Sequence, residues 1–458
     1  MEKEKNNRSS FSGKIGFVLS AAGASVGLGN IWRFPYLAAK YGGGIFLLIY
    51  ILLALTFGYT MIVAESALGR MTRKSPVGAF KAFGKKAGWL SFGGWINAII
   101  PVLIVPYYSV IGGWVIKYFV EYLKGNGAKL AEDGYFSNFI SNGLSTEICF
   151  IVFCMFTVII IYAGVRNGIE RVSKFMMPIL VVLSVIIAIY SVTRPGALAG
   201  VKYFLVPNPK NFSWMTVVTA MGQMFYSLSI AMGILVTFGS YMKKDTSIED
   251  STRNVEVFDT AIAIMAGLMI IPAVFAFSGG DPDTLQAGPS LMFITIPKVF
   301  DSMGFGTFAG ILFFLLVLFA AVTSSIALTE SAVSTVEDEL KWSRKKSTVI
   351  VGFIMILLGT LSCLGYGPLS FVKIIGMQFL DFFDFLTNSV MMPIAALMTS
   401  LFVSKVVGVD RMEEEIRHGE SKFRRKKIFV VMIKYLCPIF AIIILVSSVA
   451  NAFGWISM

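Results

Sequence analysis

The chain has 458 residues, of which 56% are hydrophobic and only 14% are charged, and its mean hydropathy is +0.76. This balance excludes a soluble protein and predicts one that crosses a membrane several times. The net charge of +12 comes from basic residues spread over the loops, which indicates membrane orientation and not nucleic-acid binding.

Cysteine and histidine are too scarce for common metal and redox chemistry. The four cysteines fall in apolar runs, as small core residues do, and the one histidine, His418, lies in a charged loop. No nucleophile–base arrangement is identifiable among the apolar segments, so an enzyme is not expected. The charged start of the chain shows no cleavable signal peptide.

Apolar segments of about twenty residues, the length that crosses a bilayer, recur along the whole chain. The basic loops after the second, fourth, eighth and tenth segments fall on one side if the N-terminus is cytoplasmic. This predicts a multi-pass plasma-membrane protein with its C-terminus outside. Eleven spans are expected, at about 14–39, 43–69, 89–123, 147–165, 168–193, 213–242, 256–278, 306–335, 346–366, 376–404 and 429–454.

The first segment is interrupted near its middle by Gly23 to Asn30, which carry three glycines and small polar side chains. A bilayer tolerates such a break only where the freed backbone groups are buried in protein, line a cavity or hold a ligand. A similar interruption, Ser227 to Gly233, lies in the sixth segment. Paired broken spans in corresponding places of two halves predict a transporter with its binding site between them.

Ionisable side chains within apolar segments are costly and indicate function. Arg33 and Asp384 either pair across a vestibule as a gate or snorkel independently, and spacing does not decide between these. Glu65 either caps the backbone of a broken neighbour or bonds an adjacent helix. Asp259 either complements a helix start or supplies the hard oxygen that a sodium ion needs.

Two further segments have both a structural and a functional interpretation. Ala320 to Ser325 either pack helices closely, with hydroxyls bonded to their own helix, or supply oxygen ligands for a second cation. In the outer loop 279–305, the apolar patch Leu291 to Pro297 forms either a surface amphipathic turn or a re-entrant cap over the entrance, and we expect the cap.

Four ordered blocks spread over nearly the whole chain resemble the signatures of the neurotransmitter:sodium symporters. They are 25–36 (SVGLGNIWRFPY), 222–229 (GQMFYSLS), 323–327 (TSSIA) and 336–339 (VEDE). The chain is most similar to an eleven-span bacterial subgroup that includes a sodium-dependent tyrosine transporter. The resemblance implies an all-α, leucine-transporter-like fold of eleven transmembrane helices, with a 5+5 inverted repeat and broken helices 1 and 6.

The implied organisation has an N-terminal segment, two repeats and a last span. The segment 1–13 carries inner-gate residues, 14–193 and 194–404 form the two repeats, and 405–458 hold a cytoplasmic loop and span eleven. The implied function is sodium-coupled import of a neutral, hydrophobic or aromatic amino acid by alternating access, with tyrosine the best guess. The implied partners are this small molecule, the lipid bilayer and sodium, with no chloride requirement.

The resemblance also implies site residues, position by position. The substrate would contact Ala24, Ser25, Leu28, Gly29, Ile104, Tyr108, Tyr226, Ser227, Ser229, Met232, Ser324 and Leu328. The first sodium ion would be held by Ser25, Asn30, Ser227 and Asp259, and the second by Gly23, Val26, Ala320, Thr323 and Ser324. Arg33 with Asp384, and Tyr108 with Tyr226, would form the outer gate, and Arg8 with Asp338, beside Phe11, the inner one.

The chain departs from the family pattern at a few of these positions. Phe11 stands where tryptophan is common, which predicts a weaker inner latch, and Asp259 stands where many members have asparagine. A fixed carboxylate at Asp259 would balance the charge that chloride balances in animal relatives. Met232 and Ala24 replace phenylalanine and asparagine of the leucine transporter, which predicts a softer and wider pocket for a bulky side chain.

Two other functions remain open from the sequence. An amino-acid sensor of the same fold would bind without transport, although the gate and ion-site residues are intact. A proton-coupled transporter would use Asp259 or Glu65 as its titrating group.

Overall fold

The computed structural model describes residues 9–279, 289–420 and 422–456, and every named secondary-structure element in these ranges is a helix. Within them, nine helical stretches are long and apolar enough to cross a membrane, which confirms an all-α, polytopic protein. The nine stretches are Gly44–Thr72, Gly84–Leu123, Gly143–Tyr162, Val165–Val192, Ile248–Ser278, Gly306–Leu340, Arg344–Leu364, Phe379–Val407 and Lys426–Ala452.

The first and sixth expected spans are the ones that are broken. The first consists of α1 (Lys14–Ser25), then η1 (Gly29–Arg33) and α2 (Phe34–Lys40), bent by 54° at the break. The sixth is divided into α12 (Trp214–Ser227) and α13 (Ile234–Ser240), each too short to cross a membrane alone. The predicted interruptions are therefore confirmed, while the count of eleven spans and the 5+5 repeat stay predictions.

Most of the other spans combine an α-helix with a shorter π-helical or 3₁₀-helical segment, labelled η. The elements of the spans are α3 (Gly44–Leu53), η2 (Ala54–Gly58), α4 (Tyr59–Thr72), η3 (Gly84–Ser91), α6 (Phe92–Leu123), α9 (Gly143–Tyr162), η4 (Val165–Glu170), α10 (Arg171–Val192), α14 (Ile248–Ser278), α16 (Gly306–Leu340), α17 (Arg344–Leu364), α18 (Phe379–Asp384), η8 (Phe385–Met391), α19 (Met392–Phe402), η9 (Val403–Val407), α21 (Lys426–Val431), η10 (Met432–Leu436) and α22 (Cys437–Ala452). The connecting helices are α5 (Pro76–Lys81), α7 (Gly127–Leu130), α8 (Tyr135–Ser141), α11 (Ala197–Leu205), η5 (Pro209–Asn211), η7 (Leu291–Thr295), α15 (Ile296–Asp301) and α20 (Val409–Arg417).

Polar residues set the starts of the helices that approach the centre. The Ser213 and Thr216 side chains form a capping box at the start of α12, and the Ser247 hydroxyl accepts the Asp250 amide at the start of α14. These caps satisfy amides that the helix cannot pair, so both helices begin at defined residues.

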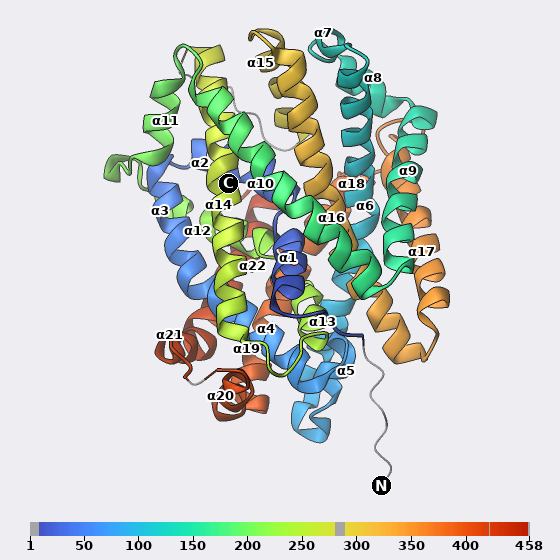
Figure 1. Cartoon of the computed structure of the whole chain (residues 1–458), viewed down its shortest axis with the longest axis vertical. Coiled ribbons are helices and arrows are strands. Elements are labelled where there is room, and N and C mark those ends of the chain that lie inside the picture. The colour runs from blue at the N-terminus through green and yellow to red at the C-terminus, as the bar shows by residue number, and fades with distance from the viewer. Residues whose placement is uncertain (1–8, 280–288, 421, 457–458) are drawn as a thin grey trace.

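The short helix α1 lies near the middle of the bundle, with longer helices around it (Figure 1). It packs against α14, α16 and α10, while α13 packs against α4. At one end of the long axis lie α20 and α21, and at the other lie α7 and α15 (Figure 1). Both breaks are therefore enclosed by helices from distant parts of the sequence.

The outer apolar patch is packed against the bundle. Leu291, Phe293 and Ile296 are buried, and the Tyr118 hydroxyl donates a 2.8 Å hydrogen bond to the Phe293 carbonyl oxygen. Its neighbour Pro289 lines a cavity on the outer side of the breaks. The expected cap is consistent with this packing, although residues 280–288 of the loop lie outside the described residues.

Candidate functional site

The first break brings the backbone of the chain against two other helices. A Cβ atom added at Gly27 would lie 2.7 Å from the Ser324 Oγ atom, and one at Gly29 would lie 2.3 Å from the Tyr226 ring. Both distances are shorter than side chains tolerate. A side chain at either position would force Ser324 or Tyr226 to shift, because α16 and α12 approach the interrupted backbone closely.

The second break holds non-glycine residues in the left-handed region. Ser229 has φ +52° and Ala231 has φ +59°, conformations that cost about 1–3 kcal/mol each without support. Support comes from two hydrogen bonds: the Ala231 amide donates to Glu65 Oε1 at 2.8 Å, and the Ser229 hydroxyl donates to the Ala24 carbonyl at 2.9 Å. The prediction that Glu65 caps a broken neighbour is confirmed, and the two breaks are bonded to each other.

A narrow cavity lies between the two breaks. Every predicted substrate residue except Ser227 lines it, together with Gly27 and Asn30. Ser227 does not line this cavity, and its hydroxyl donates to Asp259, so its contact with the substrate stays a prediction. The lining is Ala24, Ser25, Gly27, Leu28, Gly29, Asn30, Ile104, Tyr108, Tyr226, Ser229, Met232, Ser324 and Leu328.

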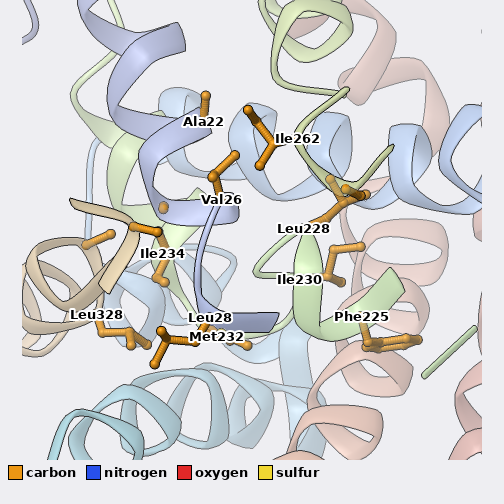
Figure 2. Close-up of a cluster of buried hydrophobic side chains, with 14 of the residues drawn as sticks. Ala22, Val26, Leu28, Phe225, Leu228, Ile230, Met232, Ile234, Ile262 and Leu328 are labelled. Carbon is orange, nitrogen blue, oxygen red and sulfur yellow. The ribbon is translucent and has the colours of Figure 1, made fainter. Parts of the chain in front are cut away.

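The cavity has a polar wall and an apolar wall. The polar wall is backbone of the two breaks with the Tyr108 hydroxyl, which accepts a 3.4 Å hydrogen bond from the Leu28 amide. The apolar wall includes Met232 and Leu328, which lie beside Leu28 in Figure 2. This combination suits a ligand with charged groups at one end and an apolar side chain at the other.

Asp259 on α14 is buried among hydrogen-bond donors from three other elements. Its Oδ1 accepts from Asn30 Nδ2 and from the Ser227 hydroxyl, each at 2.8 Å, and its Oδ2 accepts from the Tyr50 hydroxyl at 2.9 Å. Three of the four predicted ligands of the first sodium ion are thus in contact. The fourth, Ser25, instead donates its hydroxyl to the Ala21 carbonyl of its own helix at 3.1 Å.

The chemistry of the Asp259 cluster fits a small hard cation. Among the described residues, no lysine or arginine nitrogen lies within 4 Å of the Asp259 carboxylate, although Asp259 is completely buried. A buried carboxylate without a positive partner is costly, and an alkali cation would supply that partner. The oxygens of Asp259 and Ser227 are the ligand type that such cations prefer, whereas Asn30 presents its amide nitrogen to Asp259 and accepts the Gly27 amide with its Oδ1 at 3.2 Å.

The second predicted sodium site lies where α1 meets α16. The Ser324 hydroxyl is 3.2 Å from the Gly23 carbonyl oxygen and 3.3 Å from that of Val26. The Thr323 hydroxyl donates to the Ala320 carbonyl oxygen of its own helix at 3.2 Å. This bond agrees with the structural interpretation of the segment, in which hydroxyls bond to their own helix. The oxygens of Gly23, Val26 and Ser324 therefore meet where α1 faces α16, whereas those of Ala320 and Thr323 bond to each other within α16.

On the predicted outer side of the breaks lies a larger cavity, lined by Arg33, Tyr226 and Asp384 among others. Asp384 accepts hydrogen bonds from the Tyr107 hydroxyl at 3.2 Å and the Asn388 amide at 2.5 Å, and the Arg33 guanidinium lies 5.4 Å from the Tyr226 ring centre. Within the described ranges, no ion pair of 4 Å or less joins Arg33 to Asp384. The two predicted gate residues share a cavity but are not in contact.

On the predicted inner side, Phe11 is buried in contact with three rings, those of Phe17, Phe238 and Tyr241. Asp338 accepts a 2.6 Å hydrogen bond from the Ser75 amide. Arg8, its predicted partner, lies outside the described residues. The inner end is closed around Phe11.

Two side chains at the site were missed from the sequence. Tyr50 bonds to Asp259, and the Gln223 amide donates to the Gly29 carbonyl oxygen at 3.0 Å. For Tyr50 there was a usable signal, because a tyrosine hydroxyl inside a span needs a polar partner. Gln223 stands in one of the recognised blocks, but nothing in the sequence shows which carbonyl it reaches.

Comparison with known proteins gives a consistent result. The model of the sodium:neurotransmitter symporter family matches residues 8–130 and 137–454. The uncharacterized sodium-dependent transporter YhdH of Bacillus subtilis is 36% identical, with 96% of this chain and 97% of that protein covered. The sodium- and chloride-dependent glycine transporter 2 of Xenopus laevis is 27% identical, with 90% of this chain and 61% of that protein covered.

A solved structure is also similar over the whole length. The crystal structure of MhsT in complex with L-phenylalanine has a TM-score of 0.86 and 34% sequence identity, with 96% of this chain and 100% of that chain covered.

Proposed function

This chain belongs to the sodium:neurotransmitter symporter family of sodium-dependent transporters. We propose that it imports a neutral amino acid with a hydrophobic or aromatic side chain, and tyrosine is the best guess. The observation that carries this proposal is the cavity between the breaks, with its polar backbone wall and its apolar wall. MhsT, the similar structure, was solved with L-phenylalanine, which supports the same substrate class.

The two ends of the substrate are recognised by the two breaks. The carboxylate meets backbone amides near Leu28 and Gly29 and the Tyr108 hydroxyl, where the positive end of a half-helix favours an anion. The amine meets carbonyl oxygens at the ends of α1 and α12. The side chain lies against Ile104, Met232 and Leu328, and the flexible thioether adapts to a bulky group.

Two sodium ions bind beside the substrate. The first is held by the Asp259 cluster, where the cation relieves a buried, unpaired carboxylate. The second lies between the broken end of α1 and the Ser324 region of α16. Both sets of sodium ligands combine residues of a break with residues of an intact helix. Sodium binding therefore orders the breaks around the substrate.

Sodium supplies enough energy for accumulation. One charge that crosses ~100 mV yields about 2.3 kcal/mol, so two sodium ions yield about 4.6 kcal/mol from the voltage alone. At about 1.4 kcal/mol per factor of ten, this supports roughly thousandfold accumulation of a neutral solute. Since Asp259 carries the fixed negative charge, chloride is not needed.

The proposed topology has eleven spans in the plasma membrane, with spans 1–5 and 6–10 as inverted repeats and the N-terminus in the cytoplasm. The central place of α1 and the two broken spans support this arrangement. Alternating access then closes the Arg33–Asp384 side before the Phe11 side opens.

Uptake into proteoliposomes tests the function. Radiolabelled tyrosine, phenylalanine, tryptophan and leucine are offered with an imposed sodium gradient, with potassium in its place, and with gluconate in place of chloride. We expect sodium-dependent, chloride-independent accumulation of at least one aromatic amino acid. Binding without accumulation in any condition would show a sensor instead.

A substituted ion site separates the symporter from a proton-coupled transporter. Thr323→Ala with Ser324→Ala removes hydroxyl ligands of the second sodium site but no carboxyl group. We expect the stimulation of uptake by sodium to be lost. Uptake that persists unchanged and follows an imposed pH gradient contradicts sodium coupling.

A further inference from the structure

The segment that precedes α1 is attached to the start of the fifth span. Both the amide and the hydroxyl of Ser12 donate to the Glu170 carboxylate, the amide at 2.9 Å to Oε2. One turn earlier, Arg166 Nε donates to the Ser10 carbonyl oxygen at 2.9 Å. These bonds join residues more than 150 positions apart in sequence, with separations of 158 and 156.

Glu170 also occupies the place of the missing cap of α1. Gly13 precedes α1 without a side-chain cap, and α1 has no acidic residue in its first turn. A Cβ atom added at Gly16 would lie 2.5 Å from the Glu170 carboxyl carbon, so the carboxylate lies directly against that first turn. A negative charge at this position stabilises the unpaired amides and the positive end of the helix.

The same few residues are tied to a second element by apolar contacts. Phe11 is packed among Phe17, Phe238 and Tyr241, and its amide donates to the Tyr241 carbonyl oxygen at 3.1 Å. The start of α1 is therefore held by α13 through a ring cluster and by η4 through Glu170. Two exposed lysines add weaker contacts: Lys243 Nζ donates to the Ser12 carbonyl oxygen at 3.0 Å, and Lys14 lies 3.7 Å from Asp250. The inner end cannot open by movement of α1 unless these attachments are released.

Lys174 makes the Glu170 attachment reversible. It lies four residues later on α10 and contacts the Glu170 carboxylate at 2.6 Å, and it is half exposed. Because this ion pair lies within one span, it survives when α1 moves away. Release then leaves the buried carboxylate paired, and avoids the cost of an isolated buried charge.

From this geometry we propose that Glu170 is a positioning residue of the transport cycle, which holds α1 in the inner-closed state and sets how often the inner end opens. The proposal rests on alternating access, as proposed above, but not on the identity of the substrate. Glu170 touches neither the central cavity nor the sodium ligands, and it acts through the start of α1.

Two substitutions weaken this contact in independent ways. Glu170→Gln removes the charge but keeps the shape. Gly16→Ala keeps the charge but displaces it, while alanine in place of glycine favours the helix itself by about 1 kcal/mol. Glu121→Gln is the matched control. Glu121 is also a buried acid that pairs with a lysine four residues away, Lys117, and it lies at the opposite end of the bundle.

The readout is the reactivity of a cysteine introduced by Ser20→Cys on the inner half of α1, measured without substrate in sodium. Ser20 is buried, and its hydroxyl has no hydrogen-bond partner among the described residues. We expect the labelling rate to rise at least about tenfold in both Glu170→Gln and Gly16→Ala, which equals about 1.4 kcal/mol. Glu170→Asp should restore part of the protection, and Glu121→Gln should change nothing.

Transport provides the second readout. We expect Glu170→Gln to raise the KM for the amino acid and for sodium several-fold while kcat changes less, since fewer molecules face outward to bind them. Unchanged labelling in both variants overturns the proposal, as does an equal rise in Glu121→Gln. If no tested amino acid is transported, the labelling result still stands, so failure of the substrate assignment is distinguishable from failure of the latch.

Discussion

The outer and inner ends of the pathway differ in how they are held. At the proposed outer end, Arg33 and Asp384 line a cavity, and among the described residues they form no ion pair. At the inner end, Phe11 is enclosed by rings and Ser12 is bonded to Glu170. Polar groups that face a cavity exchange partners with water at little cost, whereas a buried ring leaves its contacts only at a large cost.

This difference implies that the two ends respond differently to substitution. Changes at the inner end should alter which state is populated, because buried contacts there stabilise one state. Changes at the outer end should alter the closing of an end that is already open. Four substitutions test this contrast, in order of decreasing expected effect.

Phe11→Ala should have the largest effect, because it removes the centre of the inner ring cluster. Truncation of a buried phenylalanine costs about 3–5 kcal/mol, so we expect a rise of roughly a hundredfold in the labelling of Ser20→Cys and loss of accumulation. Phe305→Ala, on an exposed ring, is the control. Low labelling in Phe11→Ala would mean that Phe11 does not close the inner end.

Glu65→Leu should have the next largest effect, at the centre between the two ends. It leaves the Ala231 amide without its carboxylate acceptor in a strained conformation, at a cost of about 1.5–3 kcal/mol. We expect a lower melting temperature and at least a tenfold weaker amino-acid affinity, measured by thermal unfolding and by equilibrium binding. Glu65→Gln keeps an acceptor and should retain much of the affinity; equal loss in both variants contradicts a capping role.

Asp384→Asn should weaken only the closing of the outer end. The side chain keeps its size and its bonds to Tyr107 and Asn388 but loses the charge that attracts Arg33. We expect uptake to fall about tenfold, a loss of about 1.4 kcal/mol, with no rise in Ser20→Cys labelling. Asp381→Asn, in the same cavity but bonded to Tyr366, is the matched control and should transport nearly normally.

Lys81→Gln should have the smallest effect and sets the baseline. Lys81 pairs with Glu339 at 2.6 Å near the inner end, but the lysine is about half exposed. Such surface pairs contribute about 0–1 kcal/mol, so uptake and labelling should change less than about fivefold. A change as large as that of Phe11→Ala would show that surface charge, and not ring packing, holds the inner end.

Much of the site was predictable because its chemistry is local in sequence. The glycines of Gly23 to Asn30 mark the first break directly, and the cavity lining follows from the two breaks and the spans that face them. Asp259 was identifiable as an acid inside an apolar span. In each case one residue type is costly in a membrane helix unless it has a function.

The remaining features depend on which atoms meet in space, which a pattern does not give. Ser227 was assigned to both the substrate and sodium, and only the fold shows that its hydroxyl turns to Asp259 and Tyr50. Glu170 stands among basic residues after the fourth span, and nothing in the sequence connects it with Ser12. Whether Arg33 reaches Asp384 was open from spacing, and the structure gives a shared cavity without contact.

Tyr226 lines both the central and the outer cavity, so one ring separates them. Entry from outside then requires rotation of a side chain, which takes picoseconds to nanoseconds for an exposed ring and longer for a packed one. Exit to the inside requires movement of a helix, on the scale of microseconds to milliseconds. We therefore expect substrate capture to be fast and turnover to be limited by the inner end, so the protein would equilibrate with the outside solution many times before each release into the cell.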